Sequence, residues 1–441
     1  MRDPMRLLLT LLLVAATPAL ATLRVDINSG QQAPMPIAVP AFPSAVPTAT
    51  PAGDTAALGA QVAAIIRANL AGSGLFKPID PAAFTTTVTP AQVTAPSFLN
   101  WRTVAAQALV SGFVTANPDG TLTVGCYLYD VFSEEELARQ GFTVTPAGWR
   151  RAAHKCSDLV YSRLTGENGY FDSRIVYVSE EGPKTKRIKR LAIMDQDGAN
   201  HRFLTSGASL VLTPRFAPNQ QTITYMSFAN NRPRVWLYNV GSGRQEAVGD
   251  FASMSFAPRF SPDGGTLYFS VTSSGNADIL AYDIASRATR RLTGSSAIDT
   301  SPSPSPDGKR IVFESDRGGT QQLYVMNADG SGQQRISFGE GRAASPVWSP
   351  RGDLIAFTRI VAGKFRIAVI RPDGSGERLL TDAWQDENPT WAPNGRVILF
   401  SRTVQGSGRV QLRSVDLTGV NDRRIATPRD GSDPAWSPLL P

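Results

Sequence analysis

One short pattern recurs through the second half of the chain at an almost constant spacing. It reads Pro-x-(Trp/Phe)-(Ser/Ala)-Pro, and successive copies begin 44, 44, 44, 43 and 45 residues apart, at Pro214, Pro258, Pro302, Pro346, Pro389 and Pro434. A period in the forties, with about four short strands in each unit, is typical of β-propeller blades. The repeat therefore predicts a fold in which each unit buries its apolar faces against its neighbours.

The unit that follows Pro302 illustrates the expected blade. Two short apolar strands, 311–313 and 323–326, are each followed by an Asp and Gly turn, because Asp can bond its own backbone and Gly accepts a positive φ. A similar pair of strands begins at Arg174 without an opening Pro pattern, whereas the last copy, 434–438, has no blade after it. We expect the C-terminal strand to complete the first unit, which gives six blades and no free sheet edge.

The N-terminus has the features of an export signal. Arg2 and Arg6 precede the apolar stretch Leu7–Ala16, which is too short to span a bilayer, and a small-x-small motif ends at Ala21. We expect cleavage after Ala21 and a mature protein that is exported and soluble. The formal net charge of +7 is mildly basic.

The composition between the signal and the repeats indicates a separate domain. We expect an alternating arm and a Pro-rich linker over 22–52, a small α/β domain over 53–166 and the propeller over 167–441. Apolar residues three and four positions apart predict one helix after Gly53 and another over 146–164. Cys126 lies in a predicted strand and Cys156 in the second helix; they either form a disulfide or remain buried thiols.

The sequence contains little that indicates catalysis. His154 and His201 are its only histidines, and it contains neither a His-Glu-x-x-His zinc motif nor a Gly-x-Ser-x-Gly nucleophile motif. We therefore expect a protein that is not an enzyme and has no cofactor and no metal. The basic run 184–190 is either a solvated strand edge or a contact for an acidic protein or anionic lipid; it lacks the interleaved aromatic residues expected of a nucleic-acid site.

Three features together resemble the TolB family, the periplasmic propeller proteins of the Tol-Pal system. They are the run 151–167 (RAAHKCSDLVYSRLTGE), the run 191–200 (LAIMDQDGAN) and the six blades behind a small α/β domain. The sequence departs from the blade pattern at 219–220, 303–304 and Arg351, which affects single turns. The resemblance implies a non-enzymatic role in outer-membrane integrity and cell division. The alternative function is that of an exported propeller hydrolase or carbohydrate-binding protein.

In a propeller, the residues just before each inner strand surround one mouth of the central channel. This mouth is either a solvated rim or a docking surface. The resemblance implies that it receives the lipoprotein Pal, other outer-membrane lipoproteins or colicin-like segments, and we expect Asp299, Thr300 and Glu387 to contribute. The full set of candidate residues is Ser255, Ala257, Asp299, Thr300, Ser301, Ala344, Ser345, Glu387, Asn388, Ser432 and Asp433.

The arm that follows the signal is the second candidate site. The resemblance implies that it binds TolA, and its residues are Thr22, Leu23, Arg24, Val25, Asp26, Ile27 and Asn28. An alternating segment of this kind either adds as a strand to a partner sheet or folds back on its own domain. Both arrangements remain open from the sequence, and Pal binding is a means of selecting between them.

Overall fold

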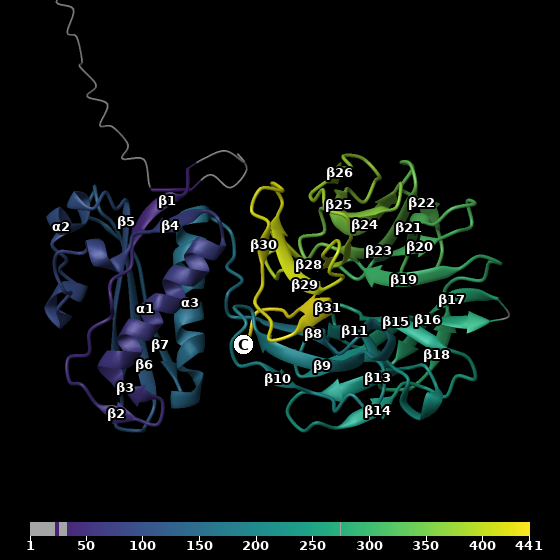
Figure 1. Cartoon of the computed structure of the whole chain (residues 1–441), viewed down its shortest axis with the longest axis horizontal. Coiled ribbons are helices and arrows are strands. Elements are labelled where there is room, and N and C mark those ends of the chain that lie inside the picture. The colour runs from purple at the N-terminus through teal and green to yellow at the C-terminus, as the bar shows by residue number, and fades with distance from the viewer. Residues whose placement is uncertain (1–22, 26–32, 274) are drawn as a thin grey trace, which may run out of the picture.

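The computed structural model describes residues 23–25, 33–273 and 275–441. Two bodies lie side by side, an N-terminal α/β domain and a C-terminal propeller (Figure 1). The predicted cleavage position Ala21 and the arm residues Thr22, Asp26, Ile27 and Asn28 lie outside the described residues. None of the helices within the described ranges is both long and apolar enough to cross a bilayer.

Five strands form the sheet of the N-terminal domain, in the order β4-β1-β5-β6-β7. Their bounds are β1 Met35–Ala38, β4 Phe76–Pro78, β5 Ala108–Ala116, β6 Leu122–Asp130 and β7 Glu136–Val144. β1 runs parallel to β4 and β5, whereas β5, β6 and β7 are antiparallel. The helices α1 (Thr55–Gly72) and α3 (Trp149–Thr165) lie on the propeller side of this sheet, and α2 (Phe98–Thr103) lies on the other side (Figure 1).

The Pro-rich stretch that we expected to be a linker belongs to the domain instead. β1 is an inner strand of the sheet, where Ile37 pairs with Pro78 on one side and Ala108 on the other. Ile37, Ala38 and Val39 are completely buried. The prolines obscure this strand in the sequence because Pro lacks the N–H that a sheet ladder normally uses. Burial of the apolar residues between the prolines decides the conformation.

The helices of this domain follow the predicted apolar spacing. Asp54 accepts hydrogen bonds from the N–H groups of Ala56 and Ala57 and so caps α1, whose inner face is buried against the sheet. Cys126 of β6 and Cys156 of α3 are joined by a disulfide, which links α3 to the sheet. The remaining short elements are β2 Ala49–Thr50, β3 Gly53–Asp54, and the 3₁₀ turns Pro81–Ala83, Pro90–Val93, Pro146–Gly148, Lys184–Lys186 and Ala229–Asn231.

The propeller consists of six four-stranded antiparallel sheets. Blade 1 contains β8 Arg174–Glu181, β9 Ile188–Asp195, β10 Arg202–Phe203 and β31 Asp430–Trp436. Blade 2 contains β11 Val211–Phe216, β12 Thr222–Ser227, β13 Arg234–Asn239 and β14 Gln245–Ala247. Blade 3 contains β15 Ser255–Phe260, β16 Thr266–Ser273, β17 Asn276–Asp283 and β18 Thr289–Arg291.

The last three blades repeat the same order of strands. Blade 4 contains β19 Asp299–Pro304, β20 Arg310–Ser315, β21 Gln322–Asn327 and β22 Gln334–Arg335. Blade 5 contains β23 Arg342–Trp348, β24 Ile355–Val361, β25 Lys364–Ile370 and β26 Arg378–Leu379. Blade 6 contains β27 Asp386–Trp391, β28 Val397–Thr403, β29 Val410–Asp416 and β30 Arg423–Arg424.

The C-terminal strand closes the ring, as predicted. β31 pairs antiparallel with β8, so residues from the two ends of the propeller share blade 1. Trp436 is buried there, and its indole N–H donates to Ser173 Oγ at 2.8 Å. Closure removes the exposed edge that an incomplete first blade would present to other chains.

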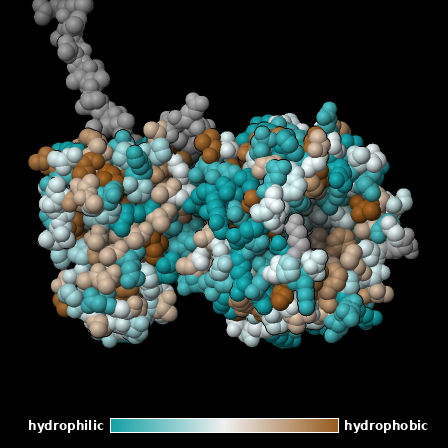
Figure 2. All heavy atoms as spheres, viewed as in Figure 1, coloured by the Kyte–Doolittle hydropathy of each residue, from teal (hydrophilic) through white to brown (hydrophobic). Residues whose placement is uncertain are grey.

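The two domains share one continuous hydrophobic core. Tyr161 of α3 packs edge-on against Tyr170 and Phe171 of the connection between the domains, and Tyr170 packs edge-on against Trp436. Glu167 accepts hydrogen bonds from Arg351 and Arg396, which belong to blades 5 and 6. Hydrophilic residues gather on the propeller beside this junction on the face shown in Figure 2. Apolar packing and ion pairs therefore both hold the propeller against the N-terminal domain.

Candidate functional site at the propeller channel

The first strands of the blades surround a central channel. Each of β31, β11, β15, β19, β23 and β27 contacts the next, and the contacts close into a ring. Residues near the starts of these strands line one end of the channel, and residues at their ends and in the following turns line the other. The candidate residues predicted from the sequence belong to the first of these two ends.

Every one of the six inner strands contains a β-bulge at the same place. In β11, for example, Leu212 pairs with Met226 and Arg215 with Thr224, so two residues lie opposite one. In each strand the residue just before the pattern proline has a φ between 48° and 56° and is not glycine. We call these six residues the bulge ring: Thr213, Ala257, Ser301, Ser345, Asn388 and Asp433.

The left-handed conformation of the bulge ring is unusual. It costs about 1–2 kcal/mol for a residue with a side chain, because the Cβ crowds the following carbonyl oxygen. Such strain persists only where the surrounding structure holds it, and it concentrates at functional sites. The same position is strained in all six blades, and this repetition marks this end of the channel as a candidate site.

Hydrogen bonds connect the bulge ring from blade to blade. Glu314 of β20 accepts from the Thr300 and Ser301 hydroxyls at 2.5 and 3.2 Å and from the Ser345 N–H at 2.6 Å. The Ser345 hydroxyl lies 3.3 Å from Asn388 Oδ1, and Asn388 Nδ2 lies 2.5 Å from Asp433 Oδ1.

Asp433 extends this chain into blade 2. Its Oδ2 accepts from the Thr213 N–H at 3.3 Å. One polar chain thus runs from blade 4 through blades 5, 6 and 1 to blade 2, and it fixes the positions of the side chains at this mouth.

The predicted residues divide into buried and accessible groups. Asp299 is fully buried, and its carboxylate accepts from Arg317 Nη2 at 2.7 Å; Thr300 is 5% exposed and bound to Glu314. Ser255 is also fully buried, and its hydroxyl oxygen accepts a hydrogen bond from the Val235 N–H. Asp433 is 7% exposed. The half-buried group, which borders the channel mouth, is Ala257, Ser301, Ala344, Ser345, Glu387, Asn388 and Ser432.

Glu387 carries the most perturbed carboxyl group among these residues. Burial raises the pKa of Glu387, the charges of Asp433 and Asp386 raise it further, and a hydrogen bond from Gln385 Nε2 at 2.8 Å lowers it. The neighbouring Asp386 is different because Arg402 donates two hydrogen bonds to its carboxylate, at 2.6 and 2.7 Å. At this mouth the carboxylates of Asp299 and Asp386 are therefore paired with arginines, whereas Glu387 has no ion pair among the described residues.

Two carboxylates that the sequence analysis missed organise the ring. Glu314 joins blades 4 and 5, and Glu180 of β8 accepts from the Ser432 hydroxyl at 2.5 Å and from Arg187 at 2.8 Å. The only signal in the sequence was an acidic residue at the end of the apolar strand 311–313. Its hydrogen-bond partners lie in other strands, so the spacing along the chain does not reveal them.

Two arginines inside the channel were also missed. Arg215 and Arg259 occupy the second position of the repeat pattern in blades 2 and 3, where the other blades have uncharged residues. Arg215 is buried and donates to the carbonyl oxygens of Pro214 and Pro434 at 2.7 and 3.5 Å. Burial lowers the pKa of Arg215 to about 10, although Asp433 acts in the opposite direction.

The basic run 184–190 is largely paired within blade 1. Arg187 donates to Glu180, Lys189 lies 2.9 Å from the same carboxylate, and Arg190 donates to Glu181 at 2.9 Å. These contacts favour the interpretation of the run as a strand edge, because three of its five basic residues already have acidic partners in the same blade.

His154 lies at the junction of the two domains. It is 2% exposed, its Nδ1 lies 2.9 Å from Asn69 Nδ2, and Asn69 Oδ1 accepts from Gln196 Nε2 of the propeller at 2.8 Å. Its Nε2 faces Asp197 at 3.8 Å, and Arg150 donates to Asp197 at 2.5 Å. Burial lowers the pKa of His154, against the opposing effect of Asp197. The histidine thus contributes to a polar network between domains.

The described part of the arm docks on its own domain. The Val25 N–H donates to the carbonyl oxygen of Leu164 at 2.8 Å, near the end of α3. Leu23 and Val25 are partly buried against the core of the N-terminal domain. In this structure, residues 23–25 therefore occupy the fold-back arrangement.

Comparisons with known proteins cover nearly the whole chain. Residues 161–440 match the family model of the TolB beta propeller domain, and residues 23–137 match that of the TolB amino-terminal domain. A Tol-Pal system protein TolB of Zymomonas mobilis is 65% identical over 419 residues, which cover 95% of this chain and 91% of that protein. One from Rhizorhabdus wittichii is 66% identical over 229 residues, which span about half (52%) of each protein.

A solved structure agrees with these matches. The crystal structure of TolB from Acinetobacter baumannii superimposes with a TM-score of 0.81 at 27% sequence identity and covers 94% of this chain and 100% of that one. The names of these relatives describe a component of the Tol-Pal system and state no reaction.

Proposed function

Because the chain belongs to the TolB family and is thus a Tol-Pal component of the cell envelope, we propose that it is a periplasmic, non-enzymatic binding protein. Its first partner is the lipoprotein Pal, which docks at the bulge ring; other outer-membrane lipoproteins and colicin-like segments use the same mouth. Its second partner is TolA, which binds the arm 22–28. The two contacts together support outer-membrane integrity and constriction during division.

The observation that carries the Pal proposal is the bulge ring. Six residues have a strained backbone conformation, and a polar chain that crosses five blades joins five of them, all except Ala257. A surface that is already ordered loses little side-chain freedom when a partner binds, so its hydrogen bonds contribute to affinity with a small entropic cost. Three polar residues at this mouth are half-buried on adjacent blades and can be reached by a partner: Ser345 and Asn388 of the ring, and Glu387 beside it.

The Pal proposal is tested by truncating these three side chains. In the combined variant Ser345→Gly, Glu387→Ala and Asn388→Gly, glycine preserves the left-handed backbone at the two ring positions. We expect Pal binding, measured by titration calorimetry, to weaken at least about tenfold. The matched control is Asp382→Ala, whose side chain is 82% exposed near the outer strand of blade 5. A folded triple variant that binds Pal normally contradicts the proposal.

The TolA proposal depends on competition for the arm. Docking of residues 23–25 uses one backbone hydrogen bond and two partly buried side chains, which is a weak attachment that a partner sheet can replace. Pal binding then selects between the docked and the released arm if Pal has different affinities for the two states.

Removal of residues 22–30 separates the two partners. We expect TolA binding to be lost and Pal binding to be retained, because the bulge ring lies in the other domain. The control replaces the same residues with a Gly/Ser segment of equal length, which preserves the chain length and removes the alternating pattern. Full TolA affinity in either variant contradicts the role of the arm.

The periplasmic location is supported by the disulfide between Cys126 and Cys156, because such bonds persist in oxidising compartments. Ala21 is the proposed cleavage position. N-terminal sequencing of the protein recovered from the periplasmic fraction should start at Thr22. An uncleaved protein recovered from the cytoplasm contradicts this proposal.

A further inference from the structure

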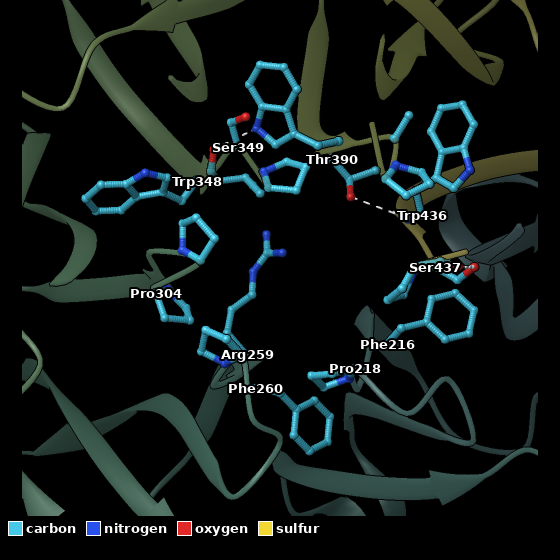
Figure 3. Close-up of a pocket in the computed structure, with 18 of the residues that line it drawn as sticks. Phe216, Pro218, Arg259, Phe260, Pro304, Trp348, Ser349, Thr390, Trp436 and Ser437 are labelled. Carbon is cyan, nitrogen blue, oxygen red and sulfur yellow. Dashed lines mark hydrogen bonds between the residues drawn. The ribbon is translucent and has the colours of Figure 1, made fainter. Parts of the chain in front are cut away.

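A second cavity opens at the end of the channel opposite the bulge ring. Its volume is about 340 Å³, which lies within the range of small-ligand pockets. Aromatic and proline rings from all six blades surround it, and Arg259 extends toward its middle between Phe216, Phe260, Trp348 and Trp436 (Figure 3). We call this space the aromatic cavity.

The walls of the aromatic cavity present mainly hydrocarbon. The indole N–H groups of Trp348, Trp391 and Trp436 donate to Gly352 O, Val347 O and Ser173 Oγ at 3.3, 2.9 and 2.8 Å. Since these donors are already satisfied inside the protein, the tryptophans offer ring carbon to a ligand.

Arg259 is the one charged residue among the described residues that line this cavity. Its guanidinium carries five N–H donors and no acceptor. Among the described residues it has no hydrogen-bond acceptor and no ion pair, and its strongest charged neighbour is another cation, Arg215. Burial, and then the charge of Arg215, lower the pKa of Arg259 well below its usual value.

One carboxylate acts on this pair, and its oxygens already accept hydrogen bonds. Asp433 faces Arg215, but its oxygens accept from Asn388 Nδ2 and from the Thr213 N–H. A cation in an apolar cavity without a counter-ion is unfavourable, and a bound anion removes that cost while making charge-assisted hydrogen bonds. The apolar walls at the same time favour an anion with an apolar body.

We propose that the aromatic cavity is a binding site for an organic carboxylate with an apolar or aromatic body, whose carboxylate is held by Arg259. Either a free acid or the terminal carboxylate of a peptide supplies this chemistry. Arg259 also borders a small cavity beside the bulge ring, but the apolar walls of the proposed site lie at the other end of the channel. The proposal does not depend on Pal or TolA binding.

Two pairs of probes test the proposal on the full chain. Phenylacetate and phenylacetamide differ in charge, and so do N-acetyl-phenylalanine and its amide; the second pair represents the end of a peptide. Binding is followed by tryptophan fluorescence, because three tryptophans line the cavity, and by the rise in melting temperature. We expect any acid that binds to do so at least about tenfold more tightly than its amide. Binding of phenylacetate alone identifies a free acid as the source.

The variant Arg259→Met preserves much of the side-chain volume and removes the charge. We expect it to lose the preference for the acids and, without ligand, to melt at or above the temperature of the unchanged protein, since a half-buried cation without an ion pair has been removed. The control Arg371→Met removes an exposed arginine outside the cavity and should preserve both properties. Three outcomes overturn the proposal. The acids and amides bind equally, neither acid binds up to 10 mM (about the weakest affinity of interest), or Arg259→Met is strongly destabilised.

Discussion

The side-chain amide of Asn388 donates a hydrogen bond of 2.5 Å to the carboxylate of Asp433, across the boundary between blade 6 and blade 1. Both residues have a positive φ and stand directly before the proline that opens their repeat. This contact lies where the C-terminal strand joins the ring, so it connects the bulge ring to the closure of the propeller. Its loss should affect both stability and the shape of the proposed Pal site.

Replacement of Asn388 by glycine tests this contact. Glycine adopts the same backbone conformation, and its relief of strain approximately offsets its greater freedom in the unfolded chain. We expect the free energy of unfolding, measured with urea, to fall by about 1–3 kcal/mol, because the Asp433 carboxylate loses a donor in a buried place. The matched control Ser345→Gly removes only the longer contact of 3.3 Å and should cost less. An Asn388→Gly variant as stable as the unchanged protein contradicts the assignment.

The strain in the bulge ring is tested at Ala257, whose methyl side chain makes no hydrogen bond. Substitution with glycine removes about 1–2 kcal/mol of left-handed strain and adds about 0.5–1 kcal/mol of unfolded-state entropy. We therefore expect Ala257→Gly to stabilise the protein slightly, as measured by the denaturant midpoint. Ala281→Gly, in the regular strand β17, should destabilise it. Equal destabilisation by both substitutions argues against strain at Ala257.

Closure of the ring is tested at Trp436. The side chain is 6% exposed and packs against Tyr170 as well as bonding Ser173. We expect Trp436→Ala to lower the free energy of unfolding by about 3–5 kcal/mol, as for other large aromatic residues removed from a core. Ser173→Ala keeps the indole ring and removes the two hydrogen bonds of the Ser173 hydroxyl, one from Trp436 and one to the Tyr170 carbonyl oxygen, and should cost less, about 1–2 kcal/mol.

Deletion of residues 433–441 is a more severe form of the same test. It exposes the edge of β8, so we expect aggregation in light scattering in addition to lower stability. A truncated protein that stays monomeric and melts at the original temperature is incompatible with closure by β31.

The stability of the junction between the domains should depend on pH through His154. Asn69 donates to Nδ1, so the neutral imidazole carries its proton on Nε2, toward Asp197. A second proton would lie on Nδ1 and face a donor, which agrees with a pKa below the usual 6.5. The unfolded chain therefore binds more protons below about pH 6.5, and stability falls as the pH decreases through that region.

The variant His154→Asn tests this dependence because its side-chain oxygen can accept from Asn69 and does not titrate. Urea denaturation between pH 5 and pH 7.5, a window about the ordinary histidine value, should show a smaller loss on acidification than in the unchanged protein. Asp195, whose pKa is raised by burial, is present in both proteins and contributes the opposite slope to each. Parallel pH profiles contradict the role of His154.

The repeat, the number of blades and their closure were predictable because they follow from local patterns. Each blade carries its own turn residues and apolar strands, and a missing strand at one end of the repeat matches an extra strand at the other. The family was likewise recognisable from the runs 151–167 and 191–200. The position of the candidate mouth followed from the order of strands within a propeller.

The roles of individual residues at that mouth were not predictable to the same degree. Asp299 is a buried partner of Arg317 instead of a surface group, and Glu314, absent from the predicted set, holds three donors from two blades. These contacts depend on the β-bulges, which shift the strand register by one residue. The residues before the prolines differ from blade to blade, so the sequence does not reveal the bulges. The prediction of a linker at β1 was wrong for a related reason. Its pairing between β4 and β5, which come later in the chain, is what identifies it as a strand.

The sequence by itself determined the architecture, because a period of about 44 residues and its turn chemistry are local properties of the chain. Only the tertiary structure decided which polar groups are satisfied. Arg215 and Arg259 occupy the same position in two successive repeats, yet the first is bound to carbonyl oxygens and the second projects into an apolar cavity. The difference arises because a side chain's partners come from neighbouring blades, whose approach is fixed only when the ring has closed.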